Sequence, residues 1–495
     1  MALLYKSTRS ADKTVTASYA ILKGLAEDGG LFVPTEFPKL DVPMAELAKM
    51  DYKGVAYEVM KLFLTDFTAE ELKYCIEKAY DEKFDTEVIA PLVKADGAYY
   101  LELFHGKTIA FKDMALSILP YLLTTSAKKN AVKNEIVILT ATSGDTGKAA
   151  LTGFADVPGT KIIVFYPKDG VSPVQEKQMV TQKGDNTFVV GIKGNFDDAQ
   201  TGVKKMFSDP ALNKLLDEGG YQFSSANSIN IGRLVPQVAY YVYAYAMLLQ
   251  NGEIADGDLI NVTVPTGNFG NILAAYYAKN MGVPIDKLIC ASNKNNVLTD
   301  FFETGRYDRN REFYVTSSPS MDILISSNLE RLIYQIAGQD AAKNTELMKS
   351  LSETGTYTIT EEMRAGLKDF YGGYATEEET AAAIRTLYER TGYVIDTHTA
   401  VASAIFRKYV AETGDAKANV IASTASPFKF SRSVMTAIKG DVSDQEEFAL
   451  VDQLVEVSGV AEPPAVTEIR TAPVRHTTVC AKDEMEQTVK SWLGI

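Results

Sequence analysis

Cysteine and histidine are scarce in this chain of 495 residues, which contains three of each. Cys75, Cys290 and Cys480 lie far apart and form no CxxC pair, so no disulfide framework is expected. A reducing, cytoplasmic compartment fits this cysteine usage best. The histidines form no HExxH motif, which argues against a zinc hydrolase, and no metal site is expected.

Long apolar runs and an excess of basic charge are also missing. No run of about 18 apolar residues appears, so no membrane span is expected. Residues 1–15 lack the apolar stretch of a secretory signal. The formal net charge is −14, which argues against nucleic acid or an anionic membrane as a main partner. Apolar residues make up 46% of the chain, which is ordinary for a globular protein of this length.

Strand-like and helix-like segments alternate from about residue 99 onward. The strands are expected at residues 135–140, 161–166, 259–264, 287–291 and 419–423. This alternation predicts an α/β protein with parallel sheets that are covered by helices on both faces. Before it, apolar residues at helical spacing over 55–64 and 69–80, with a capping box at Thr68 and Glu71, predict a helix-rich N-terminal region. The apolar stretch at 234–249, although interrupted by Pro236, predicts a buried helix.

Lys112 lies in a mostly apolar run, between Phe111 and a helix-like stretch from Asp113 through Leu122. Burial disfavours the charged form of a lysine and lowers its pKa. A neutral amine attacks carbonyl groups, so the position suits a lysine that forms a Schiff base. The alternative is a lysine that extends to the surface.

Two loops of small residues each join a strand to a helix. In residues 266–271 (TGNFGN), the glycines let the backbone approach an anion, and the helix N-terminus offers N–H groups. The alternative there is a tight structural turn. Residues 141–148 (ATSGDTGK) fail as a nucleotide-binding Walker A loop, because Thr142 and Ala149 stand where Gly and Ser or Thr are required. We interpret this second loop as a site for a carboxylate or small anion.

Together, the two loops and the candidate buried lysine suit a phosphate-bearing aldehyde cofactor, and pyridoxal 5′-phosphate is such a cofactor. Thr424, at the end of a late strand, would then offer a hydroxyl group to the pyridine nitrogen. The alternative for Thr424 is an ordinary cap or turn residue.

Motifs spread in order along nearly the whole chain resemble those of the threonine synthase family, in its long-chain fungal and bacterial form. Each motif is weak alone, but the ordered set is specific. The motifs are STR at 7–9, LAEDGGLFVP at 25–34, LFHG at 103–106, AFKD at 110–113, TSGDTG at 142–147, NSIN at 227–230 with Arg233, GNFGN at 267–271, SPSMDI at 318–323 and TASP at 424–427.

This resemblance implies a fold-type-II, tryptophan-synthase-β-like enzyme, with two parallel-sheet α/β domains and a helix-rich N-terminal region. It implies a carbon–oxygen lyase that converts O-phospho-L-homoserine and water to L-threonine and phosphate, the final step of threonine biosynthesis. A monomer or homodimer is expected. The expected regions are an N-terminal domain at 1–95, a catalytic core at 96–445 with a smaller α/β domain inserted at about 116–224, and a C-terminal segment at 446–495 that lies over the core.

The resemblance also implies roles for individual residues. Lys112 would hold the cofactor as a Schiff base and move protons, and Thr424 would bond the pyridine nitrogen. The cofactor phosphate would be held by Gly267, Asn268, Phe269, Gly270 and Asn271. The substrate carboxylate would be received by Ser143, Gly144, Asp145 and Thr146, although an ionised Asp145 cannot pair directly with a carboxylate. The candidates for the substrate phosphate are Asn227, Ser228 and Arg233, with Ser7, Thr8 and Arg9 as further candidates.

Two positions depart from the family pattern. Lys107 stands where relatives often carry proline, and we expect it to be exposed. Ser426 stands where some relatives carry a histidine, and if that histidine assists catalysis in them, its role is vacant or moved in this chain.

Two rival functions stay open at this point. One is a threonine or serine dehydratase of the same fold, which would need no anchor for a substrate phosphate. The other is a threonine-synthase-like protein that binds the cofactor or a phosphorylated ligand without turnover. An ATP-binding protein is disfavoured by the failed Walker motif.

Overall fold

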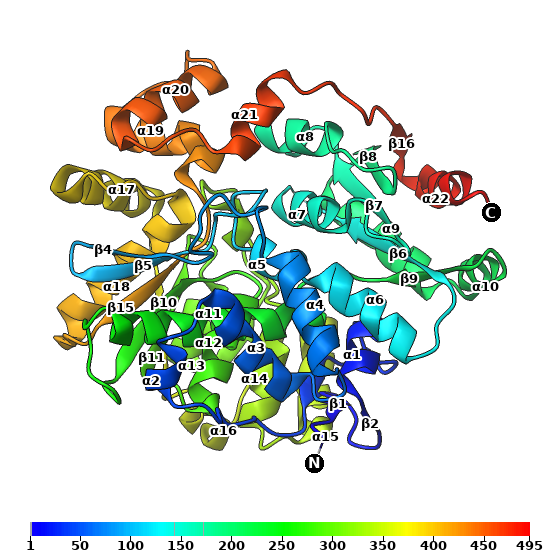
Figure 1. Cartoon of the computed structure of the whole chain (residues 1–495), viewed down its shortest axis with the longest axis horizontal. Coiled ribbons are helices and arrows are strands. Elements are labelled where there is room, and N and C mark those ends of the chain that lie inside the picture. Colours follow the sequence, from blue (N-terminus) through cyan, green and yellow to red (C-terminus); the bar gives the residue numbers. More distant parts are fainter. Residues whose placement is uncertain (1, 143, 172) are drawn as a thin grey trace.

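The computed structural model describes residues 2–142, 144–171 and 173–495, and two separate sheets dominate it (Figure 1). In the larger sheet β4 pairs antiparallel with β5, and the other neighbouring strands are parallel. Its strands, in spatial order, are β14 (Phe370–Tyr374), β11 (Ile285–Ser292), β10 (Ile260–Pro265), β15 (Asn419–Ser423), β5 (Ala98–Glu102) and β4 (Leu92–Ala95).

The smaller sheet is parallel throughout its described pairs. Its strands, in spatial order, are β16 (Val479–Ala481), β8 (Thr187–Lys193), β7 (Thr160–Pro167), β6 (Glu135–Ala141) and β9 (Tyr221–Ser224). The helices of this part of the chain are α5 (Asp113–Leu116), α6 (Leu119–Lys129), α7 (Asp145–Phe154), α8 (Pro173–Val180), α9 (Phe196–Ser208) and α10 (Pro210–Glu218). All five strands predicted from the sequence are confirmed within two residues at each end.

The helix predicted from Asp113 through Leu122 is wrong in one respect, because the chain forms two helices there. The first, α5, ends at Leu116, and α6 begins at Leu119. Pro120 occupies the first turn of α6, where a residue without an N–H is tolerated, but the same residue cannot continue a preceding helix.

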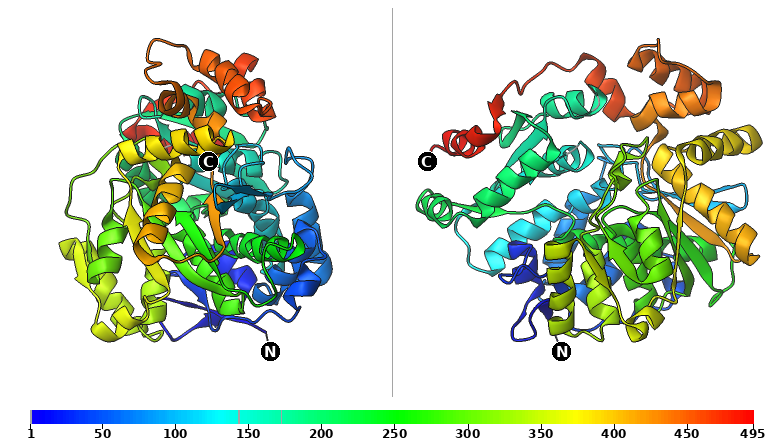
Figure 2. Two further views of the ribbon diagram at one scale, coloured as in Figure 1. Left: turned by 90° about the vertical axis from the view of Figure 1, so that its left-hand side faces the viewer. Right: turned by 180° about the vertical axis from the view of Figure 1, so that it is seen from behind.

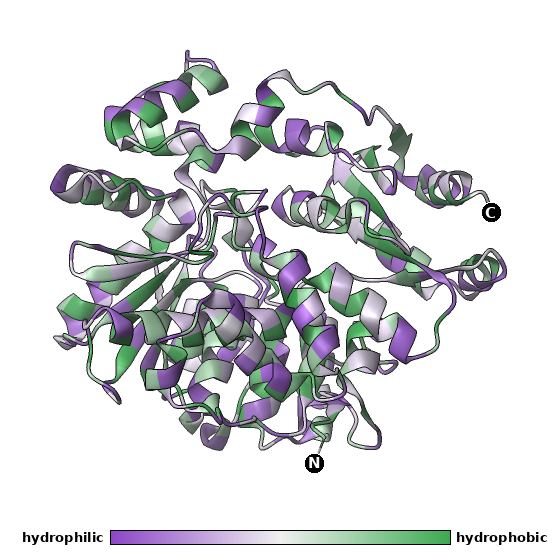
Figure 3. Ribbon diagram, viewed as in Figure 1, coloured by the Kyte–Doolittle hydropathy of each residue, from purple (hydrophilic) through white to green (hydrophobic). Residues whose placement is uncertain are grey.

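Both faces of the larger sheet are buried, as expected of a parallel sheet. In β11, Leu288 and Cys290 belong to one apolar cluster, whereas Ile289 and Ala291 belong to the other. Figure 3 shows that the strands are mostly hydrophobic, whereas the helices around them carry both hydrophobic and hydrophilic residues. The elements around this sheet are α11 (Ile231–Gln250), α12 (Gly270–Met281), α13 (Val297–Thr304), β12 (Arg306–Asp308), η1 (Pro319–Met321), α14 (Leu329–Ile336), α15 (Ala341–Thr354), β13 (Thr356–Thr358), α16 (Glu361–Ala365), α17 (Glu377–Thr391), α18 (Thr397–Thr413), η2 (Pro427–Phe430) and α19 (Ser431–Lys439).

The N-terminal region is helix-rich, as predicted, and packs against the buried helix α11. Thr68 and Glu71 form the predicted capping box of α4. On α3, the Tyr52 ring meets the edge of Tyr243 of α11, with centroids 5.3 Å apart. The elements here are β1 (Tyr5–Ser7), β2 (Thr14–Val15), α1 (Ala17–Lys23), β3 (Phe32–Pro34), α2 (Met44–Leu47), α3 (Tyr52–Phe63) and α4 (Ala69–Ala79).

The C-terminal segment does more than lie over the core. After α19 it forms α20 (Glu447–Ser458) and α21 (Pro464–Thr471), crosses to the smaller sheet, and ends in β16, η3 (Lys482–Glu484) and α22 (Met485–Leu493) (Figures 1 and 2). There β16 adds an edge strand beside β8. Among the described residues, no helix has both the length and the apolar character needed to cross a membrane.

His105 fixes the turn between β5 and Lys112 by an ionic contact on each side. Its Nδ1 lies 2.6 Å from Asp85 Oδ1, and its Nε2 lies 2.9 Å from Glu102 Oε2. Partial burial lowers the pKa of His105, but Asp85 and Glu102 outweigh this and raise the pKa from 6.5 to about 9.

We therefore predict a pH-dependent contribution of His105 to stability. A raised pKa in the folded state stabilises the fold fully below pH 6.5, and this contribution is lost as the pH rises through about 9. Thermal unfolding of the wild type and of His105→Gln should differ most at pH 6, and the gap should shrink steadily toward pH 9. A gap that does not change with pH would contradict the ion pairs.

Candidate active site

Lys112 and Thr424 meet through a short backbone pairing beyond the ends of β5 and β15. The Phe111 N–H donates to Thr424 O at 2.8 Å, and the Ser426 N–H donates to Ile109 O at 3.0 Å. Thr424 is buried, and the side chain of Lys112 is only 11% exposed. The structure thus brings together these two predicted residues, and Lys112 does not extend to the surface.

The amine of Lys112 lies among other charged groups. Its Nζ donates to Ser320 Oγ at 3.3 Å and lies 3.7 Å from Asp145 Oδ2. Burial lowers the pKa of Lys112; Asp145 opposes this shift, while the Lys429 and Arg233 cations add to it. The net shift is downward, which favours the neutral amine that the sequence analysis anticipated.

Asp145 stays an anion although it is buried. Burial alone would raise the pKa of Asp145, but Lys429 and Lys112 hold it far below its usual range. Lys429 Nζ lies 3.2 Å from Oδ1, Gln175 Nε2 donates to Oδ1 at 3.0 Å, and Ser320 Oγ donates to Oδ2 at 3.0 Å. Contact of Asp145 with a substrate remains a prediction; the structure shows its contacts with two lysines.

A histidine from α18 supports the same group of residues. His398 Nε2 accepts a hydrogen bond from the Ser320 N–H at 3.2 Å. Nδ1 therefore carries the proton and donates to Asp396 Oδ2, 2.8 Å away. The hydroxyl of Ser426 accepts the Phe428 N–H at 3.3 Å. A histidine does lie at this site, but it comes from a different element.

The loop at 267–271 turns sharply into α12. Phe269 takes a left-handed backbone conformation (φ 62°), and its side chain packs in the core against Phe302 and Phe370. A Cβ atom at Gly267 would lie 2.5 Å from the Ser320 carbonyl oxygen, so only glycine fits this approach. Asn271 accepts hydrogen bonds from two tyrosine hydroxyls, and within the described residues its buried Nδ2 has no partner.

Asn328 links this loop to the segment predicted for the substrate phosphate. Its Nδ2 donates to Asn268 O at 3.0 Å and to Ser228 Oγ at 3.4 Å, and its Oδ1 accepts from Arg331. Arg331 also donates to Ile229 O at 2.6 Å. The two predicted anion sites are therefore neighbours.

Arg233 is a buried cation without an acidic partner among the described residues. Its Nη1 donates to Ala226 O at 2.8 Å, and its buried Nε has no partner in that part of the chain. Burial lowers the pKa of Arg233 to about 10, so the guanidinium remains charged at neutral pH. A buried cation in this state suits an incoming anion.

The side chain of Thr142 binds two backbone N–H groups around the start of α7. Its Oγ1 accepts the Gly144 N–H at 3.0 Å and the Gly147 N–H at 2.9 Å. Gly144 takes a positive φ of 138°, which favours glycine. The predicted Ser143 lies outside the described residues, and Thr146 lies in the first turn of α7.

Other sequence expectations at the site have mixed outcomes. Lys107 is exposed, as predicted. Arg9, a candidate for the substrate phosphate, instead pairs with Glu330 at 2.8 Å, and Thr8 Oγ1 donates to the same carboxylate at 2.7 Å. These contacts hold the N-terminal strand against α14, so the two side chains are already engaged.

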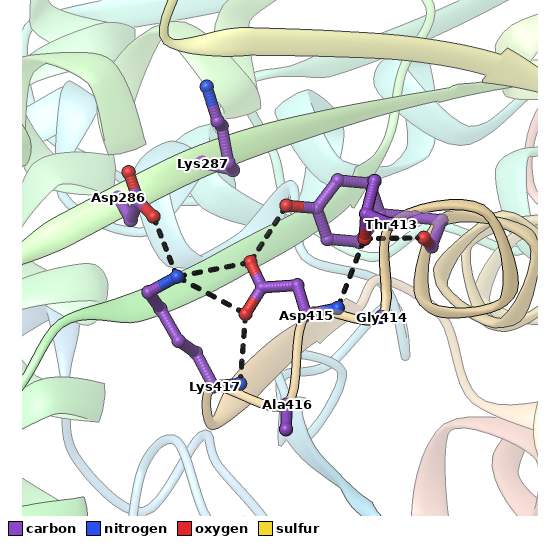
Figure 4. A pocket seen from close by; sticks show the side chains of 8 residues that line it. Asp286, Lys287, Thr413, Gly414, Asp415, Ala416 and Lys417 are labelled. Atoms are coloured by element: carbon purple, nitrogen blue, oxygen red, sulfur yellow. Dashed lines mark hydrogen bonds and ion pairs between the residues drawn. The ribbon is translucent and has the colours of Figure 1, made fainter.

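A depression lies at the opposite edge of the larger sheet, where β11 and β15 begin (Figure 4). Lys417 Nζ lies 3.0 Å from Asp286 Oδ2 and 3.2 Å from Asp415 Oδ1. Tyr409 also donates to Asp415, at 2.8 Å. The side chains that line this depression are thus engaged with one another in ion pairs and a hydrogen bond. In the described chain, no group of His, Cys, Asp and Glu side chains is arranged to hold a metal ion.

Four residues of the site were not given roles in the sequence analysis: Ser320, Asn328, His398 and Lys429. Ser320 lies within a motif that was noticed, but nothing local indicated its contacts. Lys429 carried a signal that was overlooked, because it lies between Phe428 and Phe430 much as Lys112 follows Phe111. His398 and Asn328 reach the site only through the tertiary fold.

Comparison with known protein families assigns most of the chain. Residues 4–80 match the family described as "Threonine synthase N terminus", residues 86–426 match "Pyridoxal-phosphate dependent enzyme", and residues 399–483 match "Threonine synthase, C-terminal".

Individual relatives are similar over most of the chain. The threonine synthase of Schizosaccharomyces pombe is 37% identical over 88% of this chain and 89% of its own length. The human protein threonine synthase-like 1 is 42% identical over 85% of this chain, which spans only 58% of the human protein. The crystal structure of a PLP-bound threonine synthase from Brucella melitensis is 34% identical, with a TM-score of 0.88 over 99% of both chains.

We predict that the close approach of Gly267 to Ser320 is sensitive to a single methyl group. Gly267→Ala places Cβ 2.5 Å from a backbone oxygen and should lower the free energy of unfolding by about 1–3 kcal/mol. Gly270→Ala is the control, because its Cβ would meet only Asn328 Nδ2, at an ordinary 3.5 Å. Urea unfolding of both variants tests this, and equal losses would contradict it.

Proposed function

The chain belongs to the threonine synthase family of pyridoxal-phosphate-dependent enzymes, and from that premise we propose that it converts O-phospho-L-homoserine and water to L-threonine and inorganic phosphate. The observation that carries the proposal is the surroundings of Lys112. A buried lysine with a lowered pKa lies beside a glycine-rich helix N-terminus and a buried arginine for which the described residues provide no acidic partner.

The residues present fit pyridoxal phosphate. The backbone at Gly267 has room for no side chain. Asn271 Nδ2, which finds no partner among the residues that the structure describes, is a donor in the loop predicted to hold the cofactor phosphate. The N-terminus of α12 adds N–H groups and a favourable dipole. Lys112 offers the amine, and Thr424 offers a neutral hydroxyl for the pyridine nitrogen. When bound, this cofactor draws electron density from the substrate Cα and so makes its proton removable.

The chain's own groups would divide the remaining tasks. Arg233, with Asn227 and Ser228, would hold the substrate phosphate and orient it for departure from Cγ. The donors at 143–146 would receive the carboxylate. Lys112, once free to act as a base, would accept the Cα proton and return protons as water adds at Cβ. The surrounding burial keeps bulk water from the reacting carbons until that addition.

The first experiment is an absorbance spectrum of the purified protein with and without phosphohomoserine, with released phosphate assayed alongside. A band near roughly 410–420 nm that shifts on addition of substrate, together with phosphate release, supports the proposal. Phosphate release also separates it from a dehydratase, which would form a keto acid from threonine. A stable band without any turnover would identify a binding protein instead.

We predict that Lys112→Ala loses this band and all phosphate release while its thermal unfolding stays cooperative. The reason is that Nζ of Lys112 is the amine proposed to hold the cofactor, whereas the neighbouring Lys429 amine is already engaged by Asp145 and by Thr108 O. Lys107→Ala is the matched control, because this exposed lysine lies five positions earlier in the sequence and should be dispensable. Normal turnover in Lys112→Ala would show that another group holds the cofactor and transfers the protons.

We predict that Arg233→Lys raises KM for phosphohomoserine by about 10–100-fold, because a single ammonium cannot replace a planar guanidinium on a phosphate. The affinity for pyridoxal phosphate should change far less. Steady-state kinetics and a cofactor titration give the two numbers. The reverse pattern would place Arg233 at the cofactor.

A further inference from the structure

Two lysines share one buried carboxylate in this site. Asp145 Oδ1 lies 3.2 Å from Lys429 Nζ, and Oδ2 lies 3.7 Å from Lys112 Nζ. The side chain of Lys429 is 0% exposed and that of Asp145 is 6% exposed. Lys429 also donates to Thr108 O at 2.8 Å, which is a neutral partner. A buried charge is tolerated only when an opposite charge and hydrogen bonds compensate it.

The two lysines are not equivalent in a working enzyme. The proposed function uses the Lys112 amine for the cofactor and for proton transfer, so Lys112 is positively charged in some states of the reaction and neutral in others. In the neutral states Asp145 would lack one of its two counter-ions. Its other described donors, Ser320 and Gln175, are uncharged. Of the two lysines that the described residues place within ion-pairing distance of Asp145, Lys429 is the one whose charge chemistry at Lys112 does not remove.

Asp145 also connects the part of the chain that carries the smaller sheet with elements beside the larger sheet. It is the first residue of α7, directly after the loop predicted to receive the substrate carboxylate, and it belongs to the part of the chain that carries the smaller sheet. Lys429 and Ser320 lie on η2 and η1, beside the larger sheet. The contacts of Asp145 therefore hold that loop against Lys112.

We propose that Lys429 is a positioning residue for the reaction: it is the constant counter-ion that keeps the Asp145 carboxylate, and with it the α7 loop, beside the Lys112 amine as the charge on Lys112 changes. This inference rests on the proposed function. The contacts of Lys429 with Asp145 and with Thr108 O are the basis for this role.

An electrostatic consequence makes the idea testable. The charged groups that face Lys112 are Asp145 from α7, Lys429 from η2 and Arg233 from α11. The Asp145 carboxylate raises the pKa of Lys112, whereas Lys429 and Arg233 lower it. Removing Asp145 and removing Lys429 should therefore move the protonation of Lys112 in opposite directions.

The first test measures the rate at which the full-length protein, stripped of cofactor, takes up pyridoxal phosphate at a series of pH values, followed by absorbance. Uptake requires the neutral Lys112 amine. In Asp145→Asn the midpoint should fall to lower pH, and in Lys429→Met it should rise. Shifts in the same direction, or no shift in either variant, would overturn the inference.

The second test asks whether Asp145 loses its negative charge when Lys429→Met removes its counter-ion. When Lys429→Met is loaded with cofactor, so that the Lys112 amine no longer pairs with Asp145, difference infrared spectroscopy should show a new protonated-carboxyl band, and the band should vanish in Lys429→Met/Asp145→Asn. In the cofactor-free variant Asp145 should stay ionised beside the charged Lys112 amine. Phosphate release by the loaded enzyme should fall about 100-fold in Lys429→Met, as expected for a displaced loop. Adding Asp145→Asn should cost much less than it does in the wild type, because both changes break one interaction. Additive losses, or no carboxyl band, would contradict the proposal.

Lys417→Met is the matched control. Lys417 also pairs with aspartates, but at the edge where β11 and β15 begin (Figure 4), and its loss should leave cofactor uptake and turnover unchanged. If Lys429→Met does not fold, the near-isosteric Asp145→Asn still tests the direction of the midpoint. Cofactor uptake does not need turnover. A wild type that releases no phosphate would thus refute the proposed function while the opposite midpoint shifts still test the pairing of Lys429 with Asp145.

Discussion

A buried amine is useful only if its charge is nearly balanced, and this requirement explains why the two sheets meet where they do. The larger sheet brings Lys112 to the end of β5 and Lys429 to the residues after β15. The smaller sheet brings Asp145 to the start of α7, after β6. Each sheet alone would leave buried like charges or a buried carboxylate unpaired. The electrostatic balance exists only when both are folded and in contact.

The parallel topology of the larger sheet places the site residues of several strands close together. In a parallel sheet all carboxyl ends lie at one edge, so β5, β10 and β15 deliver the lysine segment, the glycine-rich loop and Thr424 to one place. The opposite edge holds the ion pairs of Lys417 with Asp286 and Asp415. The net charge of −14 is thus compatible with a cationic interior site for an anionic substrate, because the acidic excess lies elsewhere.

What the sequence predicted well was local. Short β-branched runs predicted β6, β7, β10, β11 and β15, and an apolar neighbourhood singled out Lys112. Thr424 and the loop at 267–271 followed from strand–loop–helix order. These features are encoded by residues close in sequence, with period 2 in strands and 3.6 in helices.

What the sequence could not predict depends on distant partners. The contacts of Ser320 with Lys112, Asp145 and His398 join residues 78 to 208 positions apart. Pro120 shifted a helix start, and β16, only three residues long, lacks enough pattern to be identified. This short strand forms because its backbone can pair with the edge of β8.

That last strand has a consequence for how the molecule is made. The edge of β8, which ends at Lys193, has no β16 beside it until synthesis has reached Ala481. A nascent polypeptide on the ribosome therefore carries an open β-edge while the residues between these two strands are made. Loss of β16, by a premature stop codon or a protease, would expose that edge again in the finished protein and would favour self-association.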